Sequence, residues 1–302
     1  MLWHSRRTLL DFGAHLFLKV VAVHAYNYGK SENGLGETRP PTPEMVKAAT
    51  EEDCKSMPLS VKDATVVIPC LARSPTDVAE LVRAANSLKQ CAVVVVDDGS
   101  PDPIPAALFA DNVTVVRINV NRGPAAARNV GINHAVAQGA RLVCLMDADC
   151  EATSNWVESM VRTQSSVQGV VCGITLAGSN SVISRYHDLE GTLNGRVDKD
   201  GLLIYGCTCN MSIFTPAFRM HNNLFDESFP HAAYEDIDFC LRACAAGITV
   251  RLAPDAIVRH SYDQSLRSFV RQFRRYGRDE WRVTTRHPLF FSTLSGSTMP
   301  KY

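Results

Sequence analysis

Two aspartates, Asp147 and Asp149, stand one residue apart directly after the apolar run 142–146. A short apolar run bounded by polar residues predicts a strand that is buried on both faces. Ligands of open α/β sheets bind outside the carboxyl ends of such strands. The two carboxylates can offer hard oxygen ligands to one Mg²⁺ or Mn²⁺ that is shared with a diphosphate. The alternative is that Asp149 only caps a helix that begins near Thr153 or Asn155.

A second acidic pair, Asp97 and Asp98, follows the apolar run 91–96. Right-handed connections between parallel strands place all their carboxyl ends at one edge of the sheet. We therefore expect both acidic pairs at the same edge. Two such pairs are hard to explain as helix caps, whereas a nucleotide and a metal ion explain both.

The elements that must position these pairs alternate along the chain. Apolar runs predict strands at 64–69, 91–96, 113–118 and 142–146, and 3–4 spacing of apolar residues predicts helices at 77–89 and 125–138. This alternation predicts an α/β fold with a doubly wound, mostly parallel sheet. The second half is mixed. We expect strands at 169–176, 248–252 and 257–260, and a strand pair formed by 202–206 and 209–214. Helices are expected near 234–246 and 265–285, and a helix or a loop at 182–195.

Composition limits the function classes. The 302 residues carry no net charge and are 46% hydrophobic, so nothing general points to nucleic acid as a partner. The ten cysteines lie mostly in apolar stretches and lack zinc-ribbon spacing, which favours reduced, buried thiols.

The ends of the chain differ from its centre. Charged residues interrupt the apolar stretch within 1–28, which favours a peripheral amphipathic helix or a simple appendage over a membrane span. We expect this stretch and a linker over 1–60, a catalytic domain over 61–285 and a tail over 286–302. The expected location is cytoplasmic, with contact to a membrane surface left open.

Seven short motifs stand in a fixed order and together resemble those of the family 2 glycosyltransferases, which have the GT-A fold and use sugar nucleotides. They are Val67-Ile68-Pro69, Val96 to Ser100, Asn121 to Asn129, Asp147-Ala148-Asp149, Gly206 to Asn210, Glu235 to Asp238 and Arg275 to Arg278. The resemblance covers roughly residues 64–285 and implies a GT-A type domain whose mixed half binds the acceptor.

On the donor side, the resemblance implies that Asp98 accepts hydrogen bonds from the base or ribose and that backbone near Pro69 lines the base pocket. It implies a nucleotide contact for Arg128, for which a solvated helix arginine is the alternative. Arg275 or Arg278 would contact the diphosphate.

For the metal, Mn²⁺ or Mg²⁺, the resemblance implies that Asp149 is a ligand. Asp147 would contact the ribose or the water shell of the ion. His260 would complete the shell, and imidazole suits Mn²⁺ better than Mg²⁺. A structural histidine at a strand end is the alternative.

On the acceptor side, the resemblance implies that Asp236 is the general base and that Glu235 positions the acceptor or the base, next to Gly206 and Asn210. An inverting transfer needs one carboxylate to take the proton of the attacking hydroxyl. Acidic residues also favour the first turn of a helix through its dipole. In that simpler role Asp238 would pair with Arg242, four residues on.

The arginine-rich segment after Ser265 contains Gln272 to Tyr276, which is similar to the Gln-x-x-Arg-Trp motif of processive polysaccharide synthases except for Tyr276. Tyr276-Gly277-Arg278 instead resembles relatives that add a single sugar. The other arginines of this segment would face an anionic lipid surface, a lipid-diphosphate acceptor or only solvent.

The resemblance thus implies an inverting, metal-dependent transfer of a sugar from a nucleoside diphosphate sugar to a glycan or lipid-linked acceptor. UDP is the commonest nucleotide of the family. A catalytically degenerate scaffold of the same fold is the main alternative. A nucleotidyltransferase would need a Gly-rich loop after the first strand, where 69–75 has no glycine.

Overall fold

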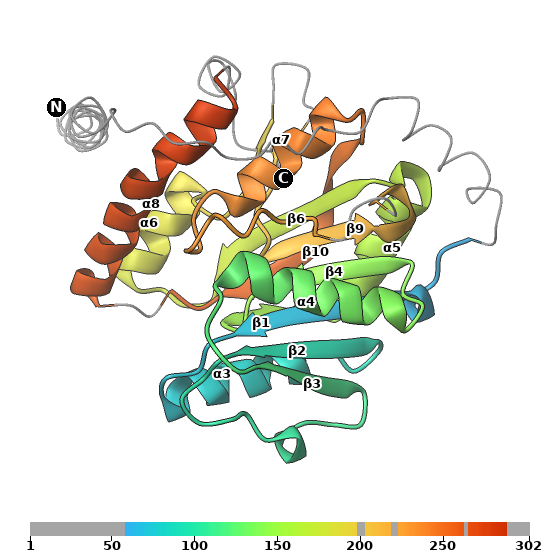
Figure 1. Ribbon diagram of the computed structural model, residues 1–302, viewed down its shortest axis with the longest axis horizontal. Helices are drawn as coiled ribbons and strands as arrows, with labels where there is room; N and C mark the ends of the chain where they lie inside the picture. The colour runs from blue at the N-terminus through green and yellow to red at the C-terminus, as the bar shows by residue number, and fades with distance from the viewer. Residues whose placement is uncertain (1–57, 198–202, 219–222, 263–264, 289–302) are drawn as a thin grey trace, which may run out of the picture.

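The computed structural model describes residues 58–197, 203–218, 223–262 and 265–288. The expected N-terminal amphipathic stretch lies outside the described residues, as does most of the expected tail. Figure 1 shows one large sheet at the centre, whose eight strands have the order β3-β2-β1-β4-β9-β6-β10-β5.

The first half of the sheet is parallel, as the sequence predicted. Its strands are β1 (Ala64–Cys70), β2 (Ala92–Asp98), β3 (Val113–Ile118) and β4 (Leu142–Met146). Two helices connect them, α3 (Pro75–Asn86) and α4 (Pro124–Ala137), and short 3₁₀ turns lie at Val61–Asp63 and Ala106–Leu108. Because every connection returns to the same end, the carboxyl ends of β1, β2 and β4 meet at one edge.

The second half is mixed, which confirms the expected fold class. Strand β9 (Asn210–Phe214) runs antiparallel between β4 and β6 (Val170–Ala177). Beyond them lie β10 (Val250–His260), parallel to β6, and the antiparallel edge strand β5 (Cys150–Ala152). The remaining elements are α5 (Trp156–Val167), α6 (Val182–Glu190), the 3₁₀ turn Thr215–Phe218, α7 (Glu235–Ala245) and α8 (Leu266–Arg286).

Two expectations for this half were wrong. The segments 202–206 and 209–214 do not pair with each other, because β8 (Leu203–Tyr205) pairs with β7 (Arg196–Val197) while β9 enters the large sheet. The segments 248–252 and 257–260 form one strand, β10, whose pairing with β6 shifts register between Leu252 and Ile257. Periodicity finds strands but not the partner of each strand.

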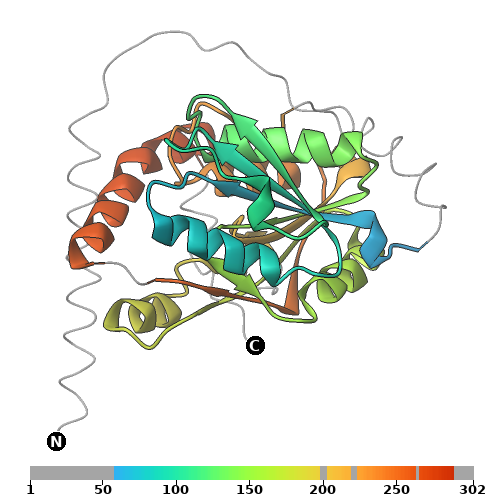
Figure 2. The same ribbon diagram turned by 90° about the horizontal axis from the view of Figure 1, so that it is seen from below.

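Helices cover both faces of the sheet (Figures 1 and 2). Side chains of β1 alternate, so that Val66 and Ile68 pack with α3 and α5 while Val67 packs with α4 and α7. Helix α4 lies unusually close, since a Cβ on Gly131 would stand 2.3 Å from Val67 Cγ1. This close packing fixes the start of α4 against the strand ends that carry the acidic pairs.

Helices α6 and α8 lie together at one end of the sheet (Figure 1), where the rings of Tyr186 and Phe269 are 5.3 Å apart. Helix α8 ends one residue later than predicted, and His287 after it bonds Asp238. The first residues of the expected tail therefore pack on the domain. Among the described residues, no helix is both long enough and apolar enough to cross a lipid bilayer.

Candidate functional site

The end of β2 carries Asp97 and Asp98 at the edge predicted for them. Asp97 is buried, accepts hydrogen bonds from the amides of Ser100 (2.9 Å) and Ile104 (3.2 Å), and pairs with Arg117. Burial raises its pKa, but these hydrogen bonds lower it more. Asp97 therefore stabilises the loop that follows β2. Its neighbour Asp98 contacts the start of α4 instead.

Asp98 lies between that loop and the start of α4. Its carboxylate accepts the backbone N–H groups of Arg122 (2.8 Å) and Gly123 (2.9 Å), and burial raises its pKa. Pro69 lies nearby at the end of β1, where it pairs with Val96 of β2. The structure thus brings together the two residues expected to line a nucleotide site.

The end of β4 brings Asp149 next to His260. Strands β5 and β10 pair with Cys150 opposite His260, and the amide of Ser261 donates to the Asp149 carbonyl at 2.8 Å. As a result, His260 Nε2 lies 3.3 Å from Asp149 Oδ1. The Asp149 carboxylate does not cap α5, which begins after Asn155. The alternative role as a helix cap is therefore wrong.

These two side chains form a candidate metal centre. One ligand atom each from Asp149, Cys150 and His260 lies within 4.8 Å of the others. Burial raises the pKa of the Cys150 thiol well above its usual range, so a hard cation would bind the carboxylate and the imidazole instead. The Asp149 side chain is 37% exposed and borders a hollow of about 210 Å³, so an ion can reach it.

Arg128 connects the carboxylate that follows β4 with a carboxylate at the start of α7. Its Nη2 lies 3.0 Å from Asp147 Oδ1 and its Nη1 lies 2.7 Å from Glu235 Oε1. The guanidinium is buried among these carboxylates, which keep its pKa above the usual value although burial opposes this. Both terminal nitrogens already bind protein groups, so the geometry favours a role in holding Asp147 and Glu235 in place.

Helix α7 presents Glu235 and Asp236 beside that arginine. The residue before the helix, Tyr234, has a φ of 68°, which is rare for a bulky side chain and turns the first helical turn toward Arg128. Glu235 also accepts the amide of Ala233 at 2.7 Å. Burial and the charge of Glu235 raise the pKa of Asp236 to about 7, while Arg128 opposes the rise. A carboxylate with this pKa is suited to proton transfer near neutral pH.

The residues expected at the acceptor have structural roles. The Asn210 amide is buried and already makes three hydrogen bonds, to Trp156 Nε1 (2.8 Å) and to the carbonyls of Ile174 (2.9 Å) and Ala256 (3.1 Å). A Cβ on Gly206 would stand 2.2 Å from Cys172 Sγ, so the position needs a glycine for packing. The Asn210 amide is thus already occupied by these partners, and Gly206 has no side chain with which to contact an acceptor.

The two arginines of α8 that were expected at the diphosphate, Arg275 and Arg278, have different surroundings. The ring of Tyr276 lies 6.5 Å from that of Tyr234, just before α7, and Arg275 stacks on Tyr276. Arg278 is exposed and reaches Asp279 only at 4.0 Å. Tyr276 thus lies beside the residue that precedes α7, with Arg275 over its ring, whereas Arg278 is exposed.

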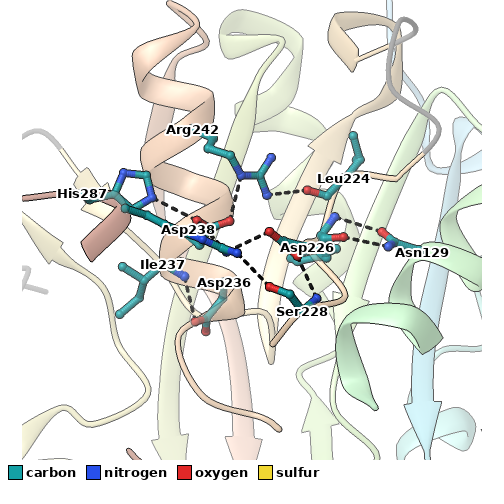
Figure 3. A network of polar contacts seen from close by, with 11 residues as sticks. Asn129, Leu224, Asp226, Ser228, Asp236, Ile237, Asp238, Arg242 and His287 are labelled. Atoms are coloured by element: carbon teal, nitrogen blue, oxygen red, sulfur yellow. Dashed lines mark hydrogen bonds and ion pairs between the residues drawn. The ribbon is translucent and has the colours of Figure 1, made fainter. Parts of the chain in front are cut away.

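A polar network, which the sequence indicated only in part, fixes the end of α8 to α7 (Figure 3). Asp238 is buried and contacts Arg242 Nε at 2.8 Å and His287 Nε2 at 3.0 Å. Arg286 contacts both Asp238 and Asp226. The pairing of Asp238 with Arg242 was predicted from the helical spacing, but no local pattern connects Asp238 with residues 48 and 49 positions further along.

Comparison with known proteins now decides the family. The sequence model of Glycosyl transferase family 2 matches residues 65–224, more than half of the chain. The chain belongs to glycosyl transferase family 2. The matched region contains β1 to β9 and therefore both acidic pairs and Arg128. Helix α7 and β10, which carry Asp236 and His260, lie outside it.

Curated relatives resemble the chain over most of its length. The pre-mycofactocin glycosyltransferase of two Mycobacterium tuberculosis strains is 30% identical in an alignment of 248 residues, and the match covers 76% of this chain but only 49% of that protein. The chain spans about half the length of the curated relatives it matches.

Solved structures support the GT-A fold at low sequence identity. The crystal structure of GalNAc-T7 with UDP, GalNAc and Mn²⁺ gives a TM-score of 0.51 at 16% identity and covers 78% of this chain and 57% of that one. The mannosyltransferase PcManGT of Pyrobaculum calidifontis, with GDP-Man and Mn²⁺, gives 0.51 at 16% identity over 77% of this chain and 67% of that one. At this identity the likeness shows the fold.

Proposed function

We propose that this chain is an inverting glycosyltransferase that moves a sugar from a nucleoside diphosphate sugar to a glycan or lipid-linked acceptor. The observation that supports the proposal is the contact of Arg128 with both Asp147 and Glu235, because it connects the end of β4 with the start of α7, where Asp236 lies. The proposed diphosphate site and the proposed base for the acceptor hydroxyl thus lie on two sides of the buried Arg128 guanidinium.

The metal centre is assigned to Asp149 and His260, with Asp147 next to it. A carboxylate oxygen and an imidazole nitrogen 3.3 Å apart suit Mn²⁺ well and Mg²⁺ less well. When bound, the ion supplies positive charge beside the phosphates of the donor. The Mn²⁺ in the two similar crystal structures supports Mn²⁺ as the first ion to test.

The donor nucleotide is assigned to Pro69 and Asp98. Of the two arginines expected at the diphosphate, Arg275 is the one proposed, because Arg278 is exposed on the outer face of α8. UDP is the first candidate, since the family uses it most often, and GDP is the second, since one similar structure contains GDP-Man. Arg128 would keep Asp147 oriented rather than contact the nucleotide.

The base is assigned to Asp236, with Glu235 held by Arg128 to position it. In the reaction, an acceptor oxygen bonds to the anomeric carbon as the bond from that carbon to the diphosphate breaks. Asp236 takes the proton of the attacking hydroxyl, and the nucleoside diphosphate leaves on the opposite face. Gly206 and Asn210 support this site through packing, and we do not assign them to acceptor contact.

The acceptor has two candidates. The outer face of α6 and α8 exposes apolar side chains next to arginines, a combination that suits an anionic lipid surface and hence a lipid-linked acceptor. The apolar members are Val182, Leu189, Leu266, Val270 and Trp281, and the basic members are Arg267, Arg271, Arg274 and Arg278. A pre-mycofactocin-type acceptor is the second candidate, because that relative matches three quarters of this chain.

The deciding experiment is calorimetric titration of the purified full chain with UDP, GDP and CMP, each with and without Mn²⁺. Tight binding of one nucleotide only in the presence of Mn²⁺ is expected. If none binds under either condition, the chain is a degenerate scaffold of this fold. Donor hydrolysis and the anomeric configuration of the product, followed by NMR, then test the sugar and the inversion.

The acceptor is tested separately, by transfer assays with a lipid-linked acceptor and with pre-mycofactocin, and by sedimentation with vesicles. Binding to vesicles that contain anionic lipid, but not to neutral ones, is expected. Equal absence from both vesicle types would contradict the lipid-surface candidate and leave the donor assignments unchanged.

A further inference from the structure

Among the described residues, the second ring nitrogen of His260, Nδ1, has no hydrogen-bond partner that would orient the ring. In most metal sites the second nitrogen of a ligating histidine donates to a carboxylate, a carbonyl or water, and this bond sets the orientation of the ring. Nε2 of His260 faces Asp149, but its buried Nδ1 has no hydrogen-bond partner within the described part of the chain. Strand pairing fixes the backbone, while rotation of the side chain must be fixed by another contact.

That contact is a stack of rings. Tyr262 stacks on His260 with 4.3 Å between ring centroids and 23° between ring planes. His187 of α6 stacks on Tyr262 at 4.2 Å and 16°. We call His260, Tyr262 and His187 the ring stack. All three are buried, with 6%, 2% and 1% of their surface exposed.

The ring stack follows from the local structure. Residues two apart on an extended chain project to the same side, so Tyr262, which follows β10, lies on the same side as His260. Helix α6 then places His187 against the far side of Tyr262. Phe273 of α8 continues the arrangement, with its ring 6.2 Å from that of His187 and nearly parallel.

His187 has the features of a packing group and not of a proton carrier. Neither of its ring nitrogens has a hydrogen-bond partner among the described residues. Burial lowers its pKa to about 4, so the ring is neutral at pH 7 and adds no charge near the metal centre. A neutral aromatic ring in this place can hold Tyr262 only through stacking.

We propose that Tyr262 and His187 are positioning residues that hold the His260 ring in the orientation that binds the divalent cation. This inference rests on the proposed metal centre. The histidine would thus be oriented by stacking, where most sites use a hydrogen bond. Helices α6 and α8 would support the metal centre through His187 and Phe273, which continue the stack beyond Tyr262.

The test measures the Kd of Mn²⁺ in the presence of UDP, by calorimetry and by the electron paramagnetic resonance signal of free Mn²⁺. Tyr262→Leu, which keeps an apolar side chain but removes the ring, is expected to weaken Mn²⁺ binding by roughly 10-fold or more, the usual scale for groups that orient a ligand. Tyr262→Phe and His187→Phe keep the stack and are expected to bind Mn²⁺ like the wild type. His187→Leu is expected to have a smaller effect than Tyr262→Leu.

A matched control separates positioning from general destabilisation. Phe218→Leu removes a buried ring that packs against Phe239, on the other face of the sheet. It is expected to lower the melting temperature as much as Tyr262→Leu while leaving the Mn²⁺ Kd unchanged. In Tyr262→Leu, excess Mn²⁺ should restore kcat, since only occupancy of the centre is reduced.

The outcomes distinguish this inference from the function on which it rests. If the wild type and Tyr262→Leu bind Mn²⁺ equally, the positioning role is wrong and the metal centre stands. If Tyr262→Phe is as weak as Tyr262→Leu, the hydroxyl and not the stack matters, which also overturns the inference. If the wild type binds no Mn²⁺ with UDP or with GDP, the metal centre itself is wrong.

Discussion

Arg128 donates a 2.7 Å hydrogen bond to Glu235, 107 residues further along the chain, and only 3% of either side chain is exposed. The other arm of the same guanidinium holds Asp147. One buried cation thus balances carboxylates from β4 and from α7. Because burying an unpaired charge is costly, each of these groups depends on the others for its place.

Replacing Arg128 by Met should destabilise the fold strongly. Loss of one partner from a buried ion pair costs about 3–5 kcal/mol, because the Glu235 carboxylate stays buried without its counter-charge. Urea unfolding at pH 7 measures the change. The control is Arg122→Met, which removes an exposed pair with Glu227 and should cost about 1 kcal/mol or less. Equal losses in the two variants would contradict the role given to Arg128.

The rate should depend on pH through Asp236. Burial and Glu235 raise its pKa to about 7, and only the unprotonated carboxylate can accept a proton. We therefore expect kcat/KM to rise with pH, with a midpoint near 7, and to level off above it. A profile that is flat from pH 5 to 9 would show that another group is the base.

Asp236→Asn should reduce kcat by roughly 10²-fold or more, the usual scale for a lost general base. The Kd of UDP with Mn²⁺ should stay near that of the wild type, since Asp236 is proposed to contact the acceptor and not the donor. Single-turnover kinetics and calorimetry measure the two quantities. Near-normal turnover in this variant would remove Asp236 from the proposed role.

Asp149→Ala should abolish the effect of Mn²⁺ on UDP binding, because the centre loses its carboxylate and His260 alone is a poor site. Titration of UDP with and without Mn²⁺ measures this loss. Glu151→Ala is the matched control. Glu151 borders the same hollow but does not belong to the cluster of possible metal ligands formed by Asp149, Cys150 and His260. Metal dependence that persists in Asp149→Ala would contradict the assignment.

The strands and the acidic pairs could be predicted because both are local. Five apolar residues before Asp147 specify a buried strand, and the chain direction of parallel strands then places Asp98 and Asp147 at one edge. The insertion of β9 between β4 and β6 could not be predicted, since strand pairing depends on long-range packing that periodicity does not record.

Two site residues show the limit of motif-based assignment. Asn210 stands where a motif suggests an acceptor contact. Its amide instead forms hydrogen bonds in the core, with the Trp156 indole and the Ile174 carbonyl. Arg128 stands in a motif that suggests a nucleotide contact, yet its partners are Asp147 and Glu235. The side-chain partners lie 19 to 107 residues away along the chain, and residue type alone does not reveal them.

Asp238 should stabilise the contact between α7 and the end of α8. Burial raises the pKa of Asp238, but the hydrogen bond from His287 and the charges of Arg242 and Arg286 lower it below its usual value of 3.8. A carboxylate with a lowered pKa contributes stability that is present above its unfolded pKa and is lost as the pH falls through its folded pKa.

Asp238→Asn should therefore lower the free energy of unfolding at pH 7 by about 2 kcal/mol, because the buried side chain loses its charge-assisted hydrogen bonds to three partly exposed partners. The difference from the wild type should shrink as the pH falls below 3.8, where the native carboxyl also becomes neutral. Urea unfolding across this range measures both effects. Asp255→Asn, which removes an exposed pair with Arg162, should change stability by less than about 1 kcal/mol at any pH. A difference that stays constant with pH would mean that Asp238 acts through its shape and not through its charge.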